Sequence, residues 1–510
     1  MSMVYLVGAG PGDPGLITVR GLACLSTADV VLYDHLVHPR LLRSAREDAE
    51  LIDVGEAAPQ PLEQEAICYL LAEKAREGKT VARLKWGDPF VFDRGGPEAL
   101  FLHEQGVRFE VVPGVPAGVG IPGYAGVPVT YPGGGDTLTF IRGHEDGGNT
   151  KPRIDWTTLS KLDGSLVCYV GRDRLPEMIR DLLTHGKTPD EPAVVIYDGT
   201  LATQRTIGST LGEIATAIKD DTEERRPAIL VVGRTANLRE HLRWFDARPL
   251  FGTRVLVTRP RDPAAELVDQ LEMFGAEAIE APMIRIVPPD DPTPLEQACA
   301  RAHEFDWIVF ASANAVDAFM EQLLDARDVR ALGSVKLCSV GPATAERLAD
   351  YGLKVDLTPT EYRADALVQA MTGTANMAGQ KVLLPHADIG REIVADELRR
   401  HGADVTEVVA YRTVAAEAVS DGGQDIYRML LEKRIDVVTF TSASAVRNFV
   451  AVVGTEQAPD LLHGTIVACI GPVTAEAARR LGIETAVMPA QYTIPAMVEA
   501  IAAYVAARAS

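Results

Sequence analysis

The sequence predicts an α/β protein made of two halves in succession, each built from two lobes. Short apolar runs such as Val4–Val7, Val30–Tyr33 and Leu166–Val170 alternate with longer segments of helical period, a pattern typical of α/β units around mostly parallel sheets. Short motifs in the C-terminal half also recur in order at a nearly constant offset, which indicates two similar α/β lobes there. At 510 residues the chain is too long for a single hydrophobic core.

The main domain boundary is expected near residue 250. The alternation is interrupted at 244–252, Trp-Phe-Asp-Ala-Arg-Pro-Leu-Phe-Gly, and a new apolar strand starts at Arg254. We therefore expect an N-terminal domain at 1–246, a short and ordered linker at 247–252, and a C-terminal domain at 253–510. In the N-terminal domain we expect one lobe at about 1–115 and another at about 116–246. In the C-terminal domain we expect one lobe at about 253–286 plus 415–510 and another at about 287–414.

The bulk composition excludes several classes of protein. No apolar run approaches the roughly 20 residues that span a bilayer, and the first residues lead straight into a strand, so we expect neither a membrane segment nor a secretory signal. Six scattered cysteines without a Cys-x-x-Cys pair favour reduced core thiols in the cytoplasm and no metal site. A net charge of −21 argues against nucleic acid as a partner, but it leaves room for an anionic ligand at a local arginine or helix N-terminus.

The repeated motifs of the C-terminal half are strand–turn–helix junctions. Ala-Ser-Ala-Asn-Ala-Val at 311–316 returns as Thr-Ser-Ala-Ser-Ala-Val at 441–446, and Val-Gly-Pro-Ala-Thr-Ala-Glu at 340–346 returns at 470–476, both 130 residues later. Such junctions aim free backbone N–H groups into the crevice beyond the strand ends. Any one serine or threonine could simply cap its helix, whereas the four junctions together suit one cleft that holds a large polyanion.

A glycine-rich loop follows the first strand of the N-terminal half. Its sequence, Gly-Ala-Gly-Pro-Gly-Asp-Pro-Gly at 8–15, is neither a Gly-x-Gly-x-x-Gly fingerprint nor a P-loop. Alone, the loop could be no more than a tight turn. Further motifs follow in order: Arg-Leu-Lys-Trp-Gly-Asp-Pro-Phe at 83–90, Arg-Gly-Gly at 94–96, Val-Pro-Gly-Val at 112–115, Gly-Val-Pro-Val-Thr at 126–130 and Arg-Pro-Ala at 226–228.

This set resembles the S-adenosylmethionine-dependent methylases of the sirohaem and cobalamin pathways over roughly residues 3–240, and most of all the uroporphyrinogen-III C-methyltransferases. The resemblance implies a two-lobed tetrapyrrole methylase fold, S-adenosylmethionine as methyl donor, and a homodimer formed through this domain. Arg94 matches the arginine of the family's Arg-Gly-Gly-Glu, which makes it the candidate catalytic residue and a holder of substrate carboxylates. The implied cofactor-binding residues, carried over one by one, are Pro11, Gly87, Asp88, Ala117, Tyr169, Val170 and Ala228.

The methylase motifs depart from the family pattern at several positions. Trp86 and Asp93 stand where the family has glycine, and Pro97 takes the place of the glutamate, although Glu98 is adjacent. The other departures are Val170 for a methionine, the stretch 55–59 without basic residues, and Tyr131-Pro132 for His-Arg. A tryptophan in place of glycine could block or reshape a cofactor pocket, so these changes leave methylase activity open.

The C-terminal half, from Thr253 to about Val505, resembles uroporphyrinogen-III synthase. The match rests on Val-Leu-Val-Thr-Arg-Pro at 255–260, both pairs of repeated turns, and Val-Ala-Tyr-Arg-Thr at 409–413. It implies cyclisation of hydroxymethylbilane in a cleft between two lobes, with inversion of the last pyrrole ring and loss of water. Tyr411 matches the family's candidate tyrosine, which could assist departure of the hydroxyl; the alternative is a strand tyrosine with a satisfied hydroxyl. Expected substrate contacts are Arg259, Ser312, Thr344, Ser442 and Thr474, with Arg261, His386 and Arg391 as further candidates.

Together the two resemblances predict a multifunctional enzyme of porphyrin biosynthesis, a lyase and a transferase in one chain. It would convert hydroxymethylbilane to uroporphyrinogen III and methylate that product to precorrin-2 on the sirohaem or cobalamin branch. Two alternatives stay open: an active synthase carrying a degenerate methylase domain that binds or dimerises, and a C-terminal half that binds a ligand without catalysis. Tyr411 and the intact Gly-Asp-Pro-Phe at 87–90 favour the bifunctional interpretation.

Overall fold

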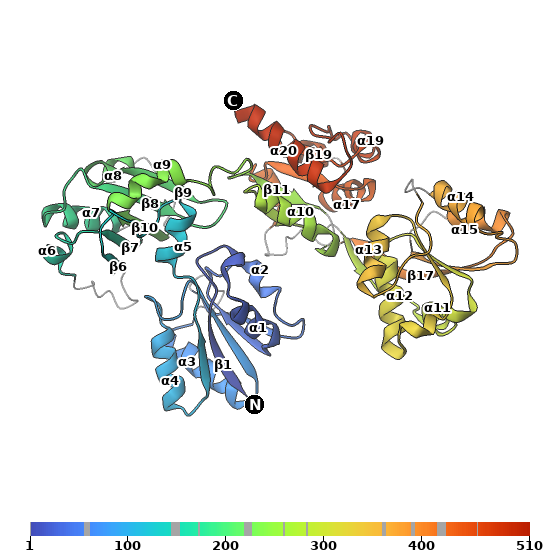
Figure 1. The fold of residues 1–510 in the computed structure, drawn as a ribbon, viewed down its shortest axis with the longest axis horizontal. Coiled ribbons are helices and arrows are strands. Elements are labelled where there is room, and N and C mark those ends of the chain that lie inside the picture. Colours follow the sequence, from blue (N-terminus) through green and yellow to red (C-terminus); the bar gives the residue numbers. More distant parts are fainter. Residues whose placement is uncertain are drawn as a thin grey trace.

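The predicted α/β architecture is confirmed, in a computed structural model that describes residues 2–55, 62–143, 154–171, 174–218, 227–258, 261–281, 284–359, 364–388, 393–415, 425–455 and 457–509. Four sheets, each flanked by helices, follow one another through the molecule (Figure 1). No helix in these ranges is long and apolar enough to cross a membrane.

The first sheet is parallel and holds the glycine-rich loop at its carboxyl edge. Its strand order is β3-β2-β4-β1-β5, with β1 at Met3–Gly8, β2 at Val30–Tyr33, β3 at Glu50–Asp53, β4 at Thr80–Lys85 and β5 at Phe109–Val112. Its helical segments are η1 (Pro14–Leu16), α1 (Val19–Thr27), α2 (Pro39–Leu42), α3 (Gln64–Arg76) and α4 (Gly95–Glu104). Helices cover both faces, which is why its central strands are nearly continuous apolar runs.

The second sheet is mostly antiparallel, which corrects the expectation of mostly parallel sheets. Its order is β6-β7-β10-β8-β9, and only β6 and β7 run parallel. Residues 198–204 join two adjacent strands, and a connection this short permits only antiparallel pairing, because a parallel crossover needs a dozen residues or more. The strands are β6 (Leu138–Arg142), β7 (Ser165–Gly171), β8 (Pro192–Tyr197), β9 (Arg205–Thr210) and β10 (Pro227–Val232); the helices are α5 (Ala117–Tyr124), α6 (Trp156–Leu159), α7 (Leu175–Thr184), α8 (Leu211–Ala217), η3 (Arg234–Leu238) and α9 (Arg239–Leu242).

The C-terminal half contains two further sheets with related orders, β12-β11-β18-β19 and β13-β17-β16-β14-β15. All their pairs are parallel except β13 with β17. The strands are β11 (Arg254–Val257), β12 (Glu277–Glu280), β13 (Ile284–Val287), β14 (Trp307–Phe310), β15 (Lys336–Ser339), β16 (Lys381–Ala387), β17 (Asp404–Ala415), β18 (Val437–Phe440) and β19 (Ile466–Cys469). The helices are α10 (Arg261–Met273), α11 (Thr293–Ala300), η4 (Ala302–Glu304), α12 (Ala313–Ala326), η5 (Val329–Leu332), α13 (Pro342–Asp350), α14 (Ala364–Thr374), α15 (Ile393–Arg400), α16 (Ile426–Leu431), α17 (Ala443–Val453), α18 (Ala458–Leu461), α19 (Pro472–Arg480) and α20 (Ile494–Ala509).

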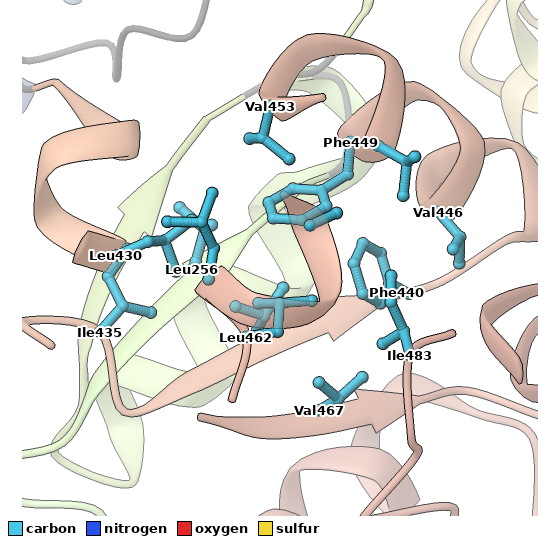
Figure 2. Packing of buried hydrophobic residues seen from close by; sticks show 14 of the residues in the cluster. Leu256, Leu430, Ile435, Phe440, Val446, Phe449, Val453, Leu462, Val467 and Ile483 are labelled. Carbon is cyan, nitrogen blue, oxygen red and sulfur yellow. The ribbon is translucent and has the colours of Figure 1, made fainter. Parts of the chain in front are cut away.

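The sequence repeat and the sheets divide this half differently. One repeat supplies β11, β12, β14 and β15 and the next supplies β16 to β19, yet each sheet combines two of these strands from one repeat with two from the other. The strand β13 is a fifth member of the second sheet. The repeat extends to the cores: the rings of Phe310 and Phe319 lie 5.6 Å apart, and those of Phe440 and Phe449 lie 5.5 Å apart. Figure 2 shows the second pair packed with Leu256 of β11, which is distant in the chain. The expected lobe boundary at 286 falls inside β13, which pairs with β17 and so belongs to the same sheet as β14 to β17.

The two halves touch each other through charged side chains and through the segment that joins them. Arg40 of α2 pairs with Glu272 and, at 2.8 Å, with Asp269 of α10, and Figure 1 shows these two helices side by side. In the joining segment, the Arg248 guanidinium lies 4.8 Å above the Trp244 ring and donates to the Glu272 carbonyl at 3.1 Å. Arg248 therefore fixes the joining segment to the Trp244 ring on one side and to the backbone of α10 on the other.

Candidate active sites

The first candidate site is formed by two loops at the carboxyl edge of the first sheet. β1 and β4 are adjacent and parallel, so the loops that follow them lie side by side. Gly10 and Gly87 exchange backbone hydrogen bonds, at 3.2 Å and 2.8 Å. Gly87 has a φ of +72°, and a Cβ on Gly114 would lie 2.2 Å from the Gly87 carbonyl. The glycines are needed because backbones approach this closely.

The carboxylate of Asp88 holds the second loop in shape. Its Oδ1 accepts the Phe90 amide at 2.8 Å, and its Oδ2 accepts the Gly114 amide at 3.0 Å. The side chain thereby ties the loop after β4 to the loop after β5. Asp88 is thus committed to backbone amides in this structure.

The second lobe completes this site through the N-terminus of α5. A Cβ on Gly87 would lie 3.7 Å from the Ala117 amide nitrogen, and the Gly118 amide donates to the Tyr169 hydroxyl at 2.7 Å. Tyr169 precedes Val170, which is paired with Ala228 across β7 and β10. Pro11 packs on the same helix, since a Cβ on Gly120 would lie 2.8 Å from its Cγ. The structure therefore brings Pro11, Gly87, Asp88, Ala117 and Tyr169 together around the start of α5. Val170 and Ala228 instead pack into the apolar cluster that contains Met178 of α7, whereas Tyr169 shares a different cluster with Ala117.

Two residues that the sequence analysis missed anchor the glycine-rich loop to the second lobe. The Asp13 amide donates to Thr200 Oγ1 at 2.9 Å, and the Tyr124 hydroxyl donates to Asp13 Oδ2 at 2.7 Å. Burial and the bond to Asp13 raise the pKa of Tyr124. Thr200 has a φ of +72°, unusual for a β-branched residue. Neither position carries a motif, so only the tertiary structure reveals them.

A buried ionic cluster lies beneath these loops and was also missed. Arg83 and Lys85 alternate in β4, so both point to one face. Arg83 pairs with Asp34 and, at 3.2 Å, with Glu98 Oε1, which Lys85 Nζ approaches equally closely. Lys85 also lies 3.0 Å from Asp93. Two cations within an otherwise apolar strand were the sequence signal that could have indicated it.

The surroundings of the cluster shift the pKa values of two of its carboxyl groups, Asp34 and Asp93, in opposite directions. Burial alone would raise the pKa of Asp34, but the charges of Arg83 and Lys85 and the hydrogen bonds from Arg83 and the Trp86 backbone bring the pKa below its usual range. For Asp93, burial outweighs the attraction of Lys85, and the pKa is raised. Asp34 is therefore held as an anion, whereas Asp93 has a greater affinity for a proton.

Arg94, the candidate catalytic arginine, begins α4 beside this cluster. Its side chain is exposed and forms no ion pair with any residue that the structure describes. A guanidinium in this position can bind a carboxylate of an incoming ligand in a bidentate manner.

In the C-terminal half, Tyr411 and Ser312 meet at the carboxyl edge of the sheet β13-β17-β16-β14-β15. Their hydroxyl oxygens lie 3.1 Å apart, and the Ala315 amide donates to Ser312 Oγ at 3.1 Å. Ser312 is thus the N-cap of α12 and a partner of Tyr411 at once. Tyr411 is 8% exposed, within the hydrophobic core of its lobe.

The other predicted residues of this half fall into four groups. Ser442 caps α17 as Ser312 caps α12, with the Ala445 amide 3.1 Å from its Oγ. Thr344 and Thr474 are both 4% exposed, so their side chains offer little surface to a ligand. His386 is partly buried, and its Nδ1 lies 2.6 Å from the Ala387 carbonyl oxygen. Arg259, Arg391 and the Arg261 side chain lie outside the described residues.

Comparison with known proteins assigns a family to each half. Residues 3–215 match the Tetrapyrrole (Corrin/Porphyrin) Methylases, and residues 265–499 match Uroporphyrinogen-III synthase HemD. Across both, the chain is 37% identical over 501 residues to the "Porphyrin biosynthesis protein HemD" of Ruminiclostridium josui, covering 97% of each chain. The chain belongs to this methylase–synthase fusion family.

Further relatives match the methylase domain of the fusion. An "S-adenosyl-L-methionine-dependent uroporphyrinogen III methyltransferase" of Methanosarcina barkeri is 43% identical over 240 residues, which are 47% of this chain and 94% of that protein. A solved structure of the Thermus thermophilus uroporphyrin-III C-methyl transferase with S-adenyl homocysteine is 37% identical, with a TM-score of 0.41, covering 46% of this chain and all of that one.

The structure shows where the residues that depart from the methylase pattern lie. Trp86 packs against the apolar cluster of the second lobe that contains Ala117 and Tyr169, while the backbone pairing of Gly87 next to it is kept. Val170 is buried in its sheet, and Pro97 is exposed in the first turn of α4. Tyr131 and Pro132 are exposed, and of the stretch 55–59 only Gly55 is described.

The described parts of the fusion hold no group of three or more His, Cys, Asp or Glu side chains that could bind a metal. All six cysteines are buried as free thiols.

Proposed function

We propose that the C-terminal domain cyclises hydroxymethylbilane to uroporphyrinogen III and that the N-terminal domain methylates uroporphyrinogen III to precorrin-2. The observation that carries this proposal is the match of a single relative across 97% of the chain, through both enzyme domains. The positions of Pro11, Gly87, Ala117 and Tyr169 around the start of α5 support the methyltransferase half.

The residues around α5 fit S-adenosylmethionine, which would supply the methyl group when bound. Glycines 8 and 114 let the three loops pack backbone against backbone, whereas a Cβ on Gly87 would meet only the Ala117 amide nitrogen, at 3.7 Å. The Ala117 amide at the start of α5 is a hydrogen-bond donor for a ligand beside Gly87. Methyl transfer needs alignment of the ring carbon behind the methyl group more than covalent help. We assign Pro11, Gly87, Asp88, Ala117, Tyr169, Val170 and Ala228 to holding the methyl donor, and Arg94 to holding a ring carboxylate.

In the synthase domain, the Tyr411 hydroxyl is the proton donor that we assign to the leaving hydroxyl of hydroxymethylbilane. Ser312, 3.1 Å away, orients that hydroxyl. Ring closure then depends on folding the linear chain so that its ends meet, which is catalysis by positioning. The starts of α12 and α17 offer backbone N–H groups to the substrate carboxylates. Ser442 and Arg259 are further proposed contacts through their side chains, and Thr344 and Thr474, whose side chains are buried, through their backbone.

The oligomeric state and the cellular location complete the proposal. The methylase resemblance supports a homodimer through the N-terminal domain, which light scattering on the purified chain would test. Six buried free cysteines are compatible with a reducing compartment and support a cytoplasmic location.

The first experiment is calorimetric titration of S-adenosylmethionine and of S-adenosylhomocysteine into the full chain, followed by anaerobic assays of each half reaction. We expect saturable binding at micromolar concentration, uroporphyrinogen III from hydroxymethylbilane, and precorrin-2 when the methyl donor is added. Synthase activity without any binding of either ligand would leave an active synthase fused to a degenerate methylase domain.

A further inference from the structure

The carboxyl edge of the sheet β12-β11-β18-β19 carries an exposed tyrosine outside the residues assigned to the substrate so far, and its proposed role rests on the synthase function proposed above. Tyr492 is 59% exposed, and it is the only exposed aromatic residue in the described part of the C-terminal half. One exposed aromatic side chain needs no explanation by itself. The position of Tyr492, its contact with a glycine and its recurrence in the repeat set it apart.

Backbone pairing places Tyr492 at the edge where the substrate is expected. β18 and β19 are adjacent and parallel, so the turns that follow them, at Ser442 and Gly471, lie side by side. The segment that leads to Tyr492 runs along the outer side of β19, where the Cys469 amide donates to the Val487 carbonyl at 2.9 Å. The chain then continues to the same carboxyl edge and reaches Gly471.

The ring of Tyr492 lies directly against the backbone of Gly471. A Cβ on Gly471 would lie 3.2 Å from both Cγ and Cδ1 of the ring, which is closer than the roughly 3.5–4.0 Å of a favourable carbon–carbon contact. The glycine is not required by its own backbone, because a φ of −171° is extended and any residue adopts it. The missing side chain therefore makes room for the ring, and the rest of the ring surface stays open to solvent.

The sequence repeat keeps both partners of this contact. At the same 130-residue offset as the repeated turns, Gly341 corresponds to Gly471 and Tyr362 to Tyr492. Gly341 also has an extended backbone, with a φ of −165°, and also precedes a helix; Tyr362 lies outside the described residues. A buried position is retained for packing, whereas an exposed aromatic residue retained in both repeats points to binding.

The substrate of the synthase offers the chemical partner for such a ring. Hydroxymethylbilane is a linear chain of four pyrrole rings that carry carboxylate arms. Backbone N–H groups at helix starts bind the carboxylates, but they leave the flat faces of the pyrrole rings without a partner. An aromatic side chain covers such a face by stacking or by an edge-to-face contact. Val473, two residues beyond Gly471, is 75% exposed and adds apolar surface at this helix start.

We propose that Tyr492 is the platform on which one pyrrole ring of hydroxymethylbilane packs while the synthase domain holds the linear chain. The ring of Tyr492 supplies the contact, and its hydroxyl takes no part in proton transfer, which is assigned to Tyr411. A contact that is made equally before and during ring closure lowers KM and leaves kcat unchanged. Tyr492 is thus a substrate-binding residue of this domain and not a proton donor.

The test measures KM and kcat for conversion of hydroxymethylbilane to uroporphyrinogen III by the full chain. The variants are Tyr492→Ala, Tyr492→Phe and Gly471→Ala, and the matched control is Tyr69→Ala, at an exposed tyrosine of α3 in the methylase half. For Y492A we expect KM to rise about 10-fold, as for the loss of stacking on one ring, with kcat within about twofold. Y492F keeps the ring and should keep both constants. G471A displaces the ring and should raise KM about threefold, and Y69A should change neither constant.

Denaturant unfolding of the same variants separates substrate binding from a structural role. Y492A with a lower free energy of unfolding and a lower kcat at unchanged KM would show that the ring only supports the turn at Gly471. Unchanged KM and kcat in Y492A would remove Tyr492 from the substrate site, and Y492F as impaired as Y492A would assign the effect to the hydroxyl. An unsubstituted chain that forms no uroporphyrinogen III would refute the synthase function, and the platform with it.

Discussion

The hydroxyl groups of Tyr411 and Ser312 lie 3.1 Å apart, although 99 residues separate them in the chain. Tyr411 extends from β17 and Ser312 caps α12, so the contact joins the end of a long strand to the start of a helix in the same lobe. Each residue was predicted from a different motif. Their contact links the repeated turn at 311–316 to the candidate proton donor, and substitution of either residue tests it.

Tyr411→Phe should lower the synthase rate while leaving the fold intact. Loss of a proton donor typically costs 100-fold or more, whereas loss of one hydroxyl hydrogen bond costs about 1 kcal/mol of unfolding free energy. Steady-state synthase assays and denaturant unfolding measure the two effects. Ser312→Ala is the partner test: it should lose about 1 kcal/mol through the cap and a smaller part of the rate. A Y411F chain with unchanged kcat would exclude Tyr411 as the donor.

Gly114→Ala should abolish S-adenosylhomocysteine binding. The new Cβ would lie 2.2 Å from the Gly87 carbonyl, a backbone atom, so one of the two loops must move. Gly96→Ala is the matched control, because nothing lies within 4 Å of its Cβ position and the residue is helical; alanine there should stabilise the chain by roughly 0.5–1 kcal/mol. Calorimetry measures the affinity of both variants for S-adenosylhomocysteine. Binding by G114A at the original affinity would show that the loops around Gly87 and Gly114 are not the binding site.

The sequence predicted those parts of the sites that depend on short local motifs. Gly87 and Asp88 lie in a strand-end loop, and the position of such a loop at the carboxyl edge follows from strand direction alone. Ser312 and Ser442 are N-caps because the turn chemistry is local. For these residues the local motif alone was enough to predict the position that the structure shows.

The missed features depend on contacts between distant segments. Tyr124 and Asp13 are 111 residues apart, and Thr200 and Asp13 are 187 apart. Arg83, Lys85 and Glu98 form one cluster only because β4 and α4 pack together. The antiparallel second sheet was missed for a related reason, since apolar periodicity indicates a strand but not its direction.

Arg40→Glu should loosen the contact between the two halves. Arg40 pairs with Asp269 and Glu272 of α10, and a glutamate there would meet two like charges. Exposed pairs contribute only about 0.2–1 kcal/mol each, so we expect faster proteolysis within 244–252 and a larger radius of gyration in X-ray scattering rather than unfolding. Arg20→Glu, which breaks a pair with Glu110 inside the first lobe, is the control. If R40E and R20E scatter alike, the ion pairs of α2 do not hold the halves together.

Asp34→Asn should remove stability that depends on pH. The pKa of Asp34 is lower in the folded chain than its ordinary value, because the attraction of Arg83 and Lys85 outweighs the effect of burial. Its contribution is therefore fully present above about pH 4 and is lost as the pH falls through the lowered pKa. The loss on substitution should be about 2 kcal/mol at pH 7 and should vanish at strongly acid pH. D93N should show the opposite trend, since the pKa of Asp93 is raised; equal pH dependence of the two variants would contradict the assignment of their charges.

Phe449→Ala tests whether the C-terminal lobes combine strands from both repeats. Phe449 is fully buried beside Phe440 and Leu256, as Figure 2 shows, and truncating such a ring costs about 3–5 kcal/mol. Because β11 and β12 share a sheet with β18 and β19, hydrogen exchange should speed up at 254–257 and 277–280 as well as at 437–440 and 466–469, while β14 to β16 stay protected. Phe319→Ala, at the equivalent position of the other repeat, should produce the reverse. If F449A exposed β16 and β17 and spared β11 and β12, each repeat would unfold as its own unit, and the exchange of strands between lobes would be wrong.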